Sequence, residues 1–351
     1  MAAILAFSAN AVSASGAVLM DGATGRILFE KQAHEMKKPA STTKIMTALI
    51  VCEQCNVLDR VRIPKAAVGI EGSSMYLQEG EILTVQELLY GLMLQSGNDA
   101  AVALAIYCGG TVEGFTELMN DKAARLGLKH THFENPNGLD SPGHYSTSAD
   151  LATLARYAMQ NPVFAQTVST RIIRVGERQL RNHNKLLWRI PGADGVKTGF
   201  TRASGRILVS SAMRNGRRLI AVTMNAPDDW QDHEFMLEQG FSKFGLRRVV
   251  EKGQVLGFVE IAGGQCSRAA LIADENFDYT FMEKEEAEVI LPKPDFVYAP
   301  VVMGQKAGTA WVMLGDQCVG KIPLIYGKTV ERKQPDRIRF WDKLLGRIKE
   351  W

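Results

Sequence analysis

Residues 38–50 read Lys-Pro-Ala-Ser-Thr-Thr-Lys-Ile-Met-Thr-Ala-Leu-Ile, which places Ser41 three residues before Lys44 at the start of an apolar run. Pro39 ends any preceding helix, and the apolar residues that follow predict a buried helix. Because three residues are nearly one helical turn, both side chains would share a face. The positive potential at a helix N-terminus favours developing negative charge on the hydroxyl oxygen. The Lys44 amine could take the hydroxyl proton only if it were itself neutral. Another part of the chain must therefore lower the pKa of this amine.

The composition is that of a soluble globular protein. The chain has 351 residues, of which 46% are hydrophobic and 23% are charged, and its length predicts two domains. The net charge of +3 is too small to indicate a nucleic-acid partner, and we expect none. The positive charge is concentrated at the C-terminal end, where residues 332–351 include seven basic and three acidic residues.

Both ends of the chain have the patterns of membrane-related segments. Residues 1–14 are apolar and then small and polar, which predicts the end of an export signal; an irregular tail is the alternative. Within residues 333–351, the stretch 338–351 placed on a helix gives an apolar face with two tryptophans opposite a cationic face. This pattern predicts an interfacial anchor helix, the alternative being a helix docked on the protein itself. We therefore expect an exported protein attached peripherally to the outer face of the cytoplasmic membrane.

No metal or other cofactor is expected. Cys52 and Cys55 have the spacing of a redox or metal pair, but no second pair at zinc spacing follows them, and they read better as buried small hydrophobic residues. Three histidines, at positions 130, 132 and 144, lie in a polar loop that lacks a carboxylate cluster. A metal site there is the weaker interpretation.

The strand and helix patterns predict an α/β protein of the α+β kind. Residues 16–30 read as a hairpin, and a second hairpin within residues 196–224 turns at Asn215-Gly216, a pair that matches the twist of hairpin strands. Residues 39–160 are largely helical, and residues 167–180 alternate like strands. We expect four antiparallel strands covered by a helical layer in a domain of residues 15–246. Short strand-like runs separated by Gly, Pro and charged residues predict a small all-β domain over residues 247–328.

Two further motifs follow Ser41 and Lys44. Ser96-Gly97-Asn98 lies between two predicted helices, and Lys197-Thr198-Gly199 begins a strand. Taken with Ser41-x-x-Lys44, these motifs resemble the penicilloyl-serine transferase group. Within that group the chain is similar to the serine-type D-alanyl-D-alanine carboxypeptidases, the low-molecular-mass penicillin-binding proteins of peptidase family S11. The longer strings 39–48, 94–100, 135–139 and 195–199 carry the same resemblance, which extends over nearly the whole chain and implies a β-lactamase/transpeptidase-like fold.

The resemblance implies a role for each motif residue. Ser41 would attack the carbonyl of the penultimate D-alanine, with Lys44 as general base. Lys197 would be the second cation that, together with desolvation, keeps Lys44 neutral. Ser96 would pass the proton to the leaving amine and Asn98 would hold Lys44 or the substrate amide. The substrate contacts would come from the strand at Lys197, Thr198, Gly199 and Phe200: the first two bind the terminal carboxylate, Gly199 admits the peptide backbone, and the Phe200 and Ser41 N–H groups bind the oxyanion.

The implied partners are the peptidoglycan stem peptide as substrate and β-lactam antibiotics as inhibitors. Trimming of stem pentapeptides would serve cell-wall maturation. A serine β-lactamase of the same group is the nearest rival, but its Glu-x-x-Leu-Asn loop has no counterpart here, where residues 134–137 read Glu-Asn-Pro-Asn. An endopeptidase or transpeptidase is chemically close, and a catalytically silent wall-binding protein is the alternative from another class.

Overall fold

The structure, a computed structural model, describes residues 8–334. The chain forms two compact units that divide between Phe244 and Gly245. The expected mixed fold is confirmed, with antiparallel sheets, a helical region and a C-terminal β unit. Residues 1–7 of the expected export signal and residues 335–351 of the expected anchor helix lie outside the described part.

The first unit is built on a five-stranded antiparallel sheet with the order β2-β1-β9-β8-β7. Its strands are β1 (Gly16–Asp21), β2 (Ile27–Lys31), β7 (Ala193–Thr201), β8 (Gly205–Arg214) and β9 (Arg217–Met224). Four strands were expected in this sheet, and the strand expected at Lys197-Thr198-Gly199 joins it as the fifth, β7, paired with β8 at one end of the sheet. The β8–β9 hairpin turns at Asn215 and Gly216, both with positive φ (50° and 77°), which fits the twist of the strands.

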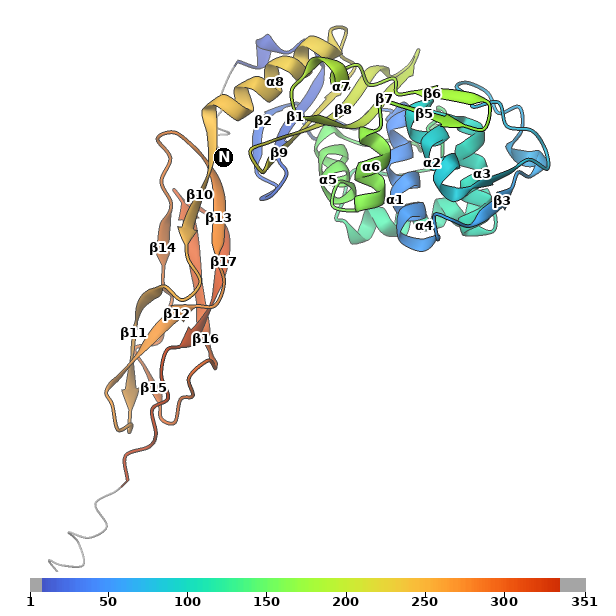
Figure 1. Ribbon diagram of the computed structural model, residues 1–351. Helices are drawn as coiled ribbons and strands as arrows, with labels where there is room; N and C mark the ends of the chain where they lie inside the picture. The colour runs from blue at the N-terminus through green and yellow to red at the C-terminus, as the bar shows by residue number, and fades with distance from the viewer. Residues whose placement is uncertain (1–7, 335–351) are drawn as a thin grey trace, which may run out of the picture. The chain divides into compact units, whose positions relative to one another are not determined.

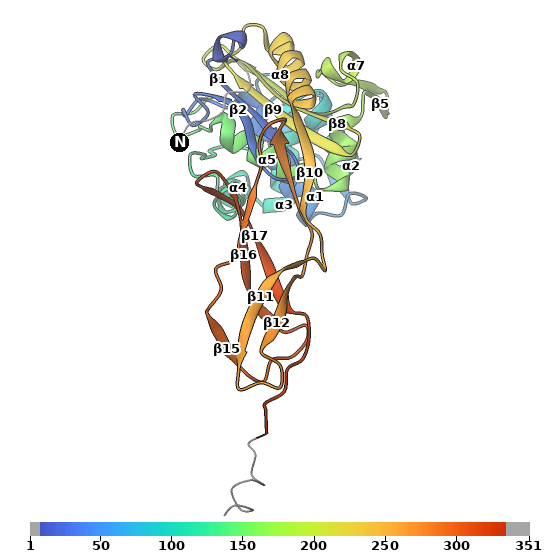
Figure 2. The ribbon, with the colours of Figure 1, turned by 90° about the vertical axis from the view of Figure 1, so that its left-hand side faces the viewer.

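Helices cover both faces of this sheet (Figure 1). One face carries α1 (Lys44–Gln54), α2 (Val85–Leu94), α3 (Asn98–Gly109), α4 (Val112–Arg125), α5 (Ser148–Ala158) and α6 (Pro162–Ser169). The other face is covered by α8 (Asp229–Lys243), which packs on β8 and β9 (Figures 1 and 2). Helix α1 is buried along residues 44–51, as expected of a helix that is apolar all round.

Shorter elements connect these layers. They are the 3₁₀ turns Ala9–Ala11, Ala40–Thr43 and Lys65–Ala67, the helix α7 (Leu186–Arg189), and the small hairpins β3 (Arg60–Arg62) with β4 (Ile82–Thr84) and β5 (Ile172–Val175) with β6 (Arg178–Arg181). The expected strand beginning at Thr167 is wrong for its first residues, which belong to α6. Asn161 caps that helix by accepting from the Val163 and Phe164 N–H groups, and Pro162 occupies its first turn.

The second unit is an all-β structure. After β10 (Phe244–Val250), its strands are β11 (Val255–Ala262), β12 (Arg268–Ala273), β13 (Phe277–Met282), β14 (Glu288–Ile290), β15 (Phe296–Tyr298), β16 (Lys306–Leu314) and β17 (Gln317–Tyr326). Six of them form one sheet in the order β14-β16-β17-β12-β11-β15, while β10 pairs with β13. Apolar side chains such as Leu271, Val312 and Ile322 form its own core. Among residues 8–334, no helix is both long enough and apolar enough to span a bilayer.

Candidate active site

Ser41 and Lys44 lie where the chain enters α1. Ser41 belongs to the 3₁₀ turn Ala40–Thr43 rather than to α1 itself, and Lys44 is the first residue of the α-helix. The Lys44 Nζ is 3.1 Å from Ser41 Oγ, 2.6 Å from Asn98 Oδ1 and 2.5 Å from the Asn137 carbonyl oxygen. The Lys44 side chain has no exposed surface. A buried amine therefore faces the hydroxyl of Ser41 with two oxygen acceptors around it.

The electrostatic surroundings favour a neutral Lys44. Burial lowers the pKa of Lys44 well below its usual range, and the positive charge of Lys197 lowers it further, while Asp99 acts in the opposite direction. A neutral amine has two N–H groups and one lone pair. The two carbonyl oxygens can only accept, so they take the two N–H groups, and the lone pair is left for the Ser41 hydroxyl.

The loop of residues 135–139 packs against the Ala40–Thr43 turn that carries Ser41. Gly138 has a φ of 87°, and a Cβ atom there would lie 1.9 Å from the Ala40 carbonyl oxygen. Thr47 Oγ1 donates to the Pro136 carbonyl at 2.6 Å, and Asn137 accepts from Lys44. Ala40 itself has a φ of 46°, a conformation that L residues rarely adopt and that must be held by its surroundings. Only glycine fits between the loop and the nucleophile turn.

His144 packs against the same turn in neutral form. Its Nδ1 accepts from the Glu134 N–H at 3.0 Å, so its Nε2 carries the proton that is shared with Thr43 Oγ1 at 2.8 Å. Burial lowers the pKa of His144 to about 4. The residue therefore fixes Thr43 beside Lys44.

The second motif connects α2 to α3. Ser96 has a φ of 61° and is 5% exposed, which turns the chain sharply before α3. Asn98 begins α3, and besides holding Lys44 it donates through Nδ2 to the Glu71 carbonyl at 2.5 Å. Its backbone N–H donates to the Ser73 carbonyl at 2.7 Å. The amide of Asn98 thus links Lys44 to the loop at residues 71–73.

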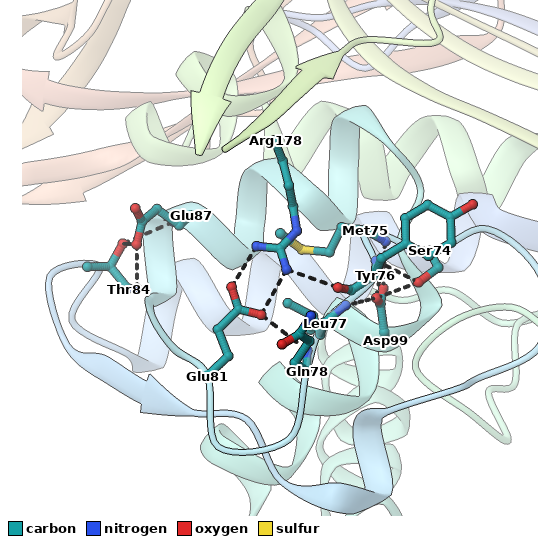
Figure 3. Close-up of polar contacts among 10 residues, drawn as sticks. All are labelled: Ser74, Met75, Tyr76, Leu77, Gln78, Glu81, Thr84, Glu87, Asp99 and Arg178. Carbon is teal, nitrogen blue, oxygen red and sulfur yellow. Dashed lines mark hydrogen bonds and ion pairs between the residues drawn. The ribbon is translucent and has the colours of Figure 1, made fainter. Parts of the chain in front are cut away.

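Asp99 and Arg178 hold the continuation of that loop, residues 74–81, and neither residue was predicted from the sequence (Figure 3). The Asp99 carboxylate accepts from Ser74 Oγ at 2.6 Å and from the backbone N–H groups of Met75 and Leu77 at 3.1 Å. Arg178 in β6 binds Glu81 through two hydrogen bonds of 2.6 and 2.9 Å. Asp99 directly follows Asn98 in the second motif, and that position is the signal that could have revealed it.

The third motif lies on β7 at the edge of the sheet. Lys197 is 1% exposed, its Nζ donates to the Thr198 carbonyl at 2.8 Å, and burial lowers its pKa to about 7. A Cβ atom at Gly199 would be 3.3 Å from the Ser41 amide nitrogen and 3.4 Å from the Ala40 Cβ. The strand therefore passes close to the nucleophile turn, and its outer edge is available to an added peptide backbone.

The three motifs meet at one cavity of about 890 Å³. Five of the eight predicted site residues line it: Ser41, Ser96, Thr198, Gly199 and Phe200. The other three, Lys44, Asn98 and Lys197, are buried behind the wall, with exposures of 0, 4 and 1%. Residues 8–334 contain no group of three or more His, Cys, Asp or Glu side chains placed to hold a metal ion.

Arg206 and Trp230 also line the cavity, and neither was predicted. Arg206 lies opposite Phe200 in the β7–β8 register and is 3.3 Å from the buried Asp229 at the start of α8. The Trp230 indole N–H is buried and has no partner within the described part of the chain. The position of Arg206 at the cavity depends on the β7–β8 pairing register, and that of Trp230 depends on where α8 begins. No local pattern in the sequence could therefore have indicated either residue.

Comparison with known proteins identifies the family. The family model described as D-alanyl-D-alanine carboxypeptidase, peptidase family S11, matches residues 4–228, and the model of the penicillin-binding protein 5 C-terminal domain matches residues 244–332. D-alanyl-D-alanine carboxypeptidase DacF of Bacillus subtilis is 32% identical over 95% of this chain and 89% of its own length. DacC of Escherichia coli is 33% identical over 98% of this chain and 90% of its own length.

The fold agrees with this assignment. The structure of penicillin-binding protein 5 from Haemophilus influenzae superposes with a TM-score of 0.80 and 29% identity, over 92% of this chain and 98% of that one. The family predicted from the three motifs is thereby confirmed. The chain belongs to peptidase family S11, the D-alanyl-D-alanine carboxypeptidases of the penicillin-binding group.

Proposed function

We propose that this serine hydrolase removes the terminal D-alanine from peptidoglycan stem peptides through an acyl-enzyme on Ser41. The observation that supports it most is the contact of 3.1 Å between Ser41 Oγ and a fully buried Lys44 whose other neighbours are acceptors. A hydroxyl is a weak nucleophile unless a base is adjacent, and Lys44 supplies that base.

The reaction runs in two steps. Ser41 Oγ attacks the carbonyl of the penultimate D-alanine while Lys44 takes the hydroxyl proton, and the N–H groups of Ser41 and Phe200 bind the oxyanion. Ser96 passes a proton to the leaving amine, and the C–N bond breaks. Water then hydrolyses the ester and restores Ser41. A β-lactam antibiotic would acylate Ser41 in the same way as the first step. The resulting ester would not be hydrolysed, so the antibiotic would inhibit the enzyme.

Arg206 would anchor the terminal carboxylate together with Thr198. The two residues line the same cavity, and an arginine keeps its charge at any physiological pH. Lys197 is less suited to direct contact because it is buried and has a pKa of about 7. This refines the expected role of Lys197, which would act on the carboxylate through Thr198 and on the pKa of Lys44.

The test of the proposed function measures D-alanine released from diacetyl-Lys-D-Ala-D-Ala and labelling by a fluorescent penicillin. We expect release and stable labelling for the wild type and neither for Ser41→Ala. Labelling without release would contradict the carboxypeptidase reaction. Rapid loss of the label with turnover of the drug would favour a β-lactamase.

The carboxylate anchor has its own test. Arg206→Gln should reduce the rate of hydrolysis about 10-fold more for the peptide acid than for the corresponding peptide amide. A loss of this size is expected for one hydrogen bond to a charged group. Arg214→Gln is a matched control, because Arg214 also joins β8 to α8, through Glu238, but lies outside the cavity wall. An equal effect on acid and amide would contradict the role of Arg206.

We further propose that residues 333–351 form the amphipathic helix that attaches an exported protein to the outer face of the cytoplasmic membrane. The support is the sequence pattern of two tryptophans opposite a cationic face. Deleting residues 336–351 should release the protein from sedimenting vesicles. Unchanged sedimentation would contradict the anchor.

A further inference from the structure

Helices α1 and α3 pack on each other and each carries a site residue at its start. Lys44 is the first residue of α1 and Asn98 is the first residue of α3, and their side chains meet at 2.6 Å. Cys55, the C-cap residue of α1, and Cys108, in the last turn of α3, lie at the other ends. Each cysteine is therefore about 15 Å along its helix from the active-site end.

The thiols of Cys55 and Cys108 are in direct contact. A hydrogen bond joins the two side chains. The Cys108 Sγ also donates at 3.6 Å to Oε1 of Gln54, the residue before Cys55. Because the two helices touch at both ends, they run in the same direction and have matched lengths. Both cysteines are half-buried, so a small reagent can reach their sulfur atoms.

Cys52 has the sequence spacing of a partner for Cys55 but is the poorer one. Burial raises the pKa of the Cys52 thiol to about 12, which keeps it protonated. The hydrogen bond between the other two thiols instead lowers the pKa of Cys108 and raises that of Cys55. Since the thiolate is the form that attacks a disulfide, Cys108 is the reactive member of the pair and Cys55 is the thiol beside it.

The ends of the two helices allow the sulfur atoms to come closer. A disulfide bond is only about 2 Å long, so the thiols must approach beyond hydrogen-bond distance. Cys55 has left the helix, with a φ of −112° and a ψ of 145°, and Gly110 ends α3 with a φ of 75°. Small backbone shifts at these positions disturb few hydrogen bonds inside either helix.

We propose that Cys55 and Cys108 form a disulfide that joins the C-terminal ends of α1 and α3, with an organic disulfide as the oxidant. The Cys108 thiolate attacks one sulfur of the oxidant, which gives a mixed disulfide and releases one thiolate. Cys55 then loses its proton and attacks the Cys108 sulfur, so that the Sγ–Sγ bond forms and the second thiolate leaves. The two protein thiols lose two electrons, and the oxidant becomes two thiols that take up the two protons.

The disulfide ties together the two helices that carry Lys44 and Asn98. It closes the chain over residues 55–108, a loop of about 50 residues, and a closed loop of that length strongly restricts the unfolded chain. The bond uses no catalytic residue, so it is independent of the proposed hydrolase reaction. On the proposed export of the chain, the pair lies in an environment where disulfides persist.

The test treats the reduced full chain with oxidised glutathione. A Cys266→Ser/Cys318→Ser background removes the exposed cysteines of the second unit. Mass spectrometry of non-reduced proteolytic peptides should find the peptide of Cys55 linked to that of Cys108. The Tm of the oxidised protein should exceed that of the reduced protein by about 10 °C. Cys108→Ala should lose both the link and the difference in Tm, while the matched control Cys52→Ala should keep both.

Each other outcome has a definite meaning. Unchanged thiols, or glutathione adducts on Cys55 and Cys108 without a link between them, would overturn the proposal. A link from Cys55 to Cys52 would overturn the assignment of the partner. A link without a rise in Tm would overturn the stabilising role. Acylation by a fluorescent penicillin should be equally fast in the oxidised and reduced protein. Its absence from both would contradict the proposed function and leave the disulfide in place.

Discussion

Gly138→Ala is the perturbation that probes most directly how the active site is held. Gly138 has a φ of 87°, and an added Cβ would lie 1.9 Å from the Ala40 carbonyl oxygen, next to Ser41. Real Cβ atoms keep at least 3.0 Å from such neighbours, so the two groups must separate by at least 1.1 Å, the difference of the two values. A misplacement of about 1 Å costs about 100-fold in rate when reacting groups must be aligned.

The backbone penalty has to be separated from this displacement. An L residue at positive φ costs about 1–2 kcal/mol wherever it occurs. Gly127 supplies the matched control, because its φ is 70° and nothing lies within 4 Å of an added Cβ. Gly127→Ala should therefore lose stability by that amount and acylate normally.

The assay is the second-order rate of acylation by a fluorescent penicillin, with folding of both variants checked by circular dichroism. We expect Gly138→Ala to acylate about 100-fold more slowly than Gly127→Ala. Equal acylation rates in two folded variants would refute the argument that the loop at residues 135–139 positions the nucleophile turn.

Three other perturbations test separate parts of the account. Lys197→Met removes the positive charge that helps to lower the pKa of Lys44, so the acid limb of the pH profile of acylation should move to higher pH; an unmoved limb would contradict the coupling. Asp99→Asn should lower the free energy of unfolding by about 2 kcal/mol in a urea titration, because charged hydrogen bonds to Ser74 and Met75 are lost. The control Asp121→Asn, at an exposed position, should leave the free energy of unfolding unchanged. Burial lowers the pKa of His233 to about 3, so below pH 6.5 the unfolded chain binds a proton there that the folded chain does not. His233 alone should therefore lower stability by up to about 1.4 kcal/mol per pH unit as pH drops from 6.5 to 4.5, in addition to the contribution of His144. The slope should be smaller by that amount in His233→Gln, and an equal slope would contradict this cause.

Local patterns in the sequence were sufficient for much of the fold. A capping box, a pattern that residue types alone can indicate, begins α2 at Thr84 and Glu87, and both of its reciprocal hydrogen bonds form. The Asn215-Gly216 turn was found because its backbone conformation is nearly restricted to those residue types. Helix α6 was misread over residues 167–169 because Thr and Val also favour strands, while the signal that settles it, the Asn161-Pro162 start, lies upstream.

The site was predictable where chemistry is carried by short motifs. Ser41 and Lys44 are adjacent on one turn, so their contact follows from helical spacing alone. Arg206, Asp229 and Arg178 were not predictable, because each reaches its position through strand register or through a contact between distant segments. Long-range contacts of this kind leave no periodic trace in a single sequence.

Identification of the acylated residue tests the central claim, that Ser41 is the nucleophile activated by a neutral Lys44. The protein is incubated with benzylpenicillin, and the adduct is located by mass spectrometry of the intact chain and of its proteolytic peptides. We expect one penicilloyl group on the peptide that contains Ser41, no adduct in Ser41→Ala, and an adduct that forms far more slowly in Lys44→Gln. An adduct on another residue, or one that persists in Ser41→Ala, would contradict it.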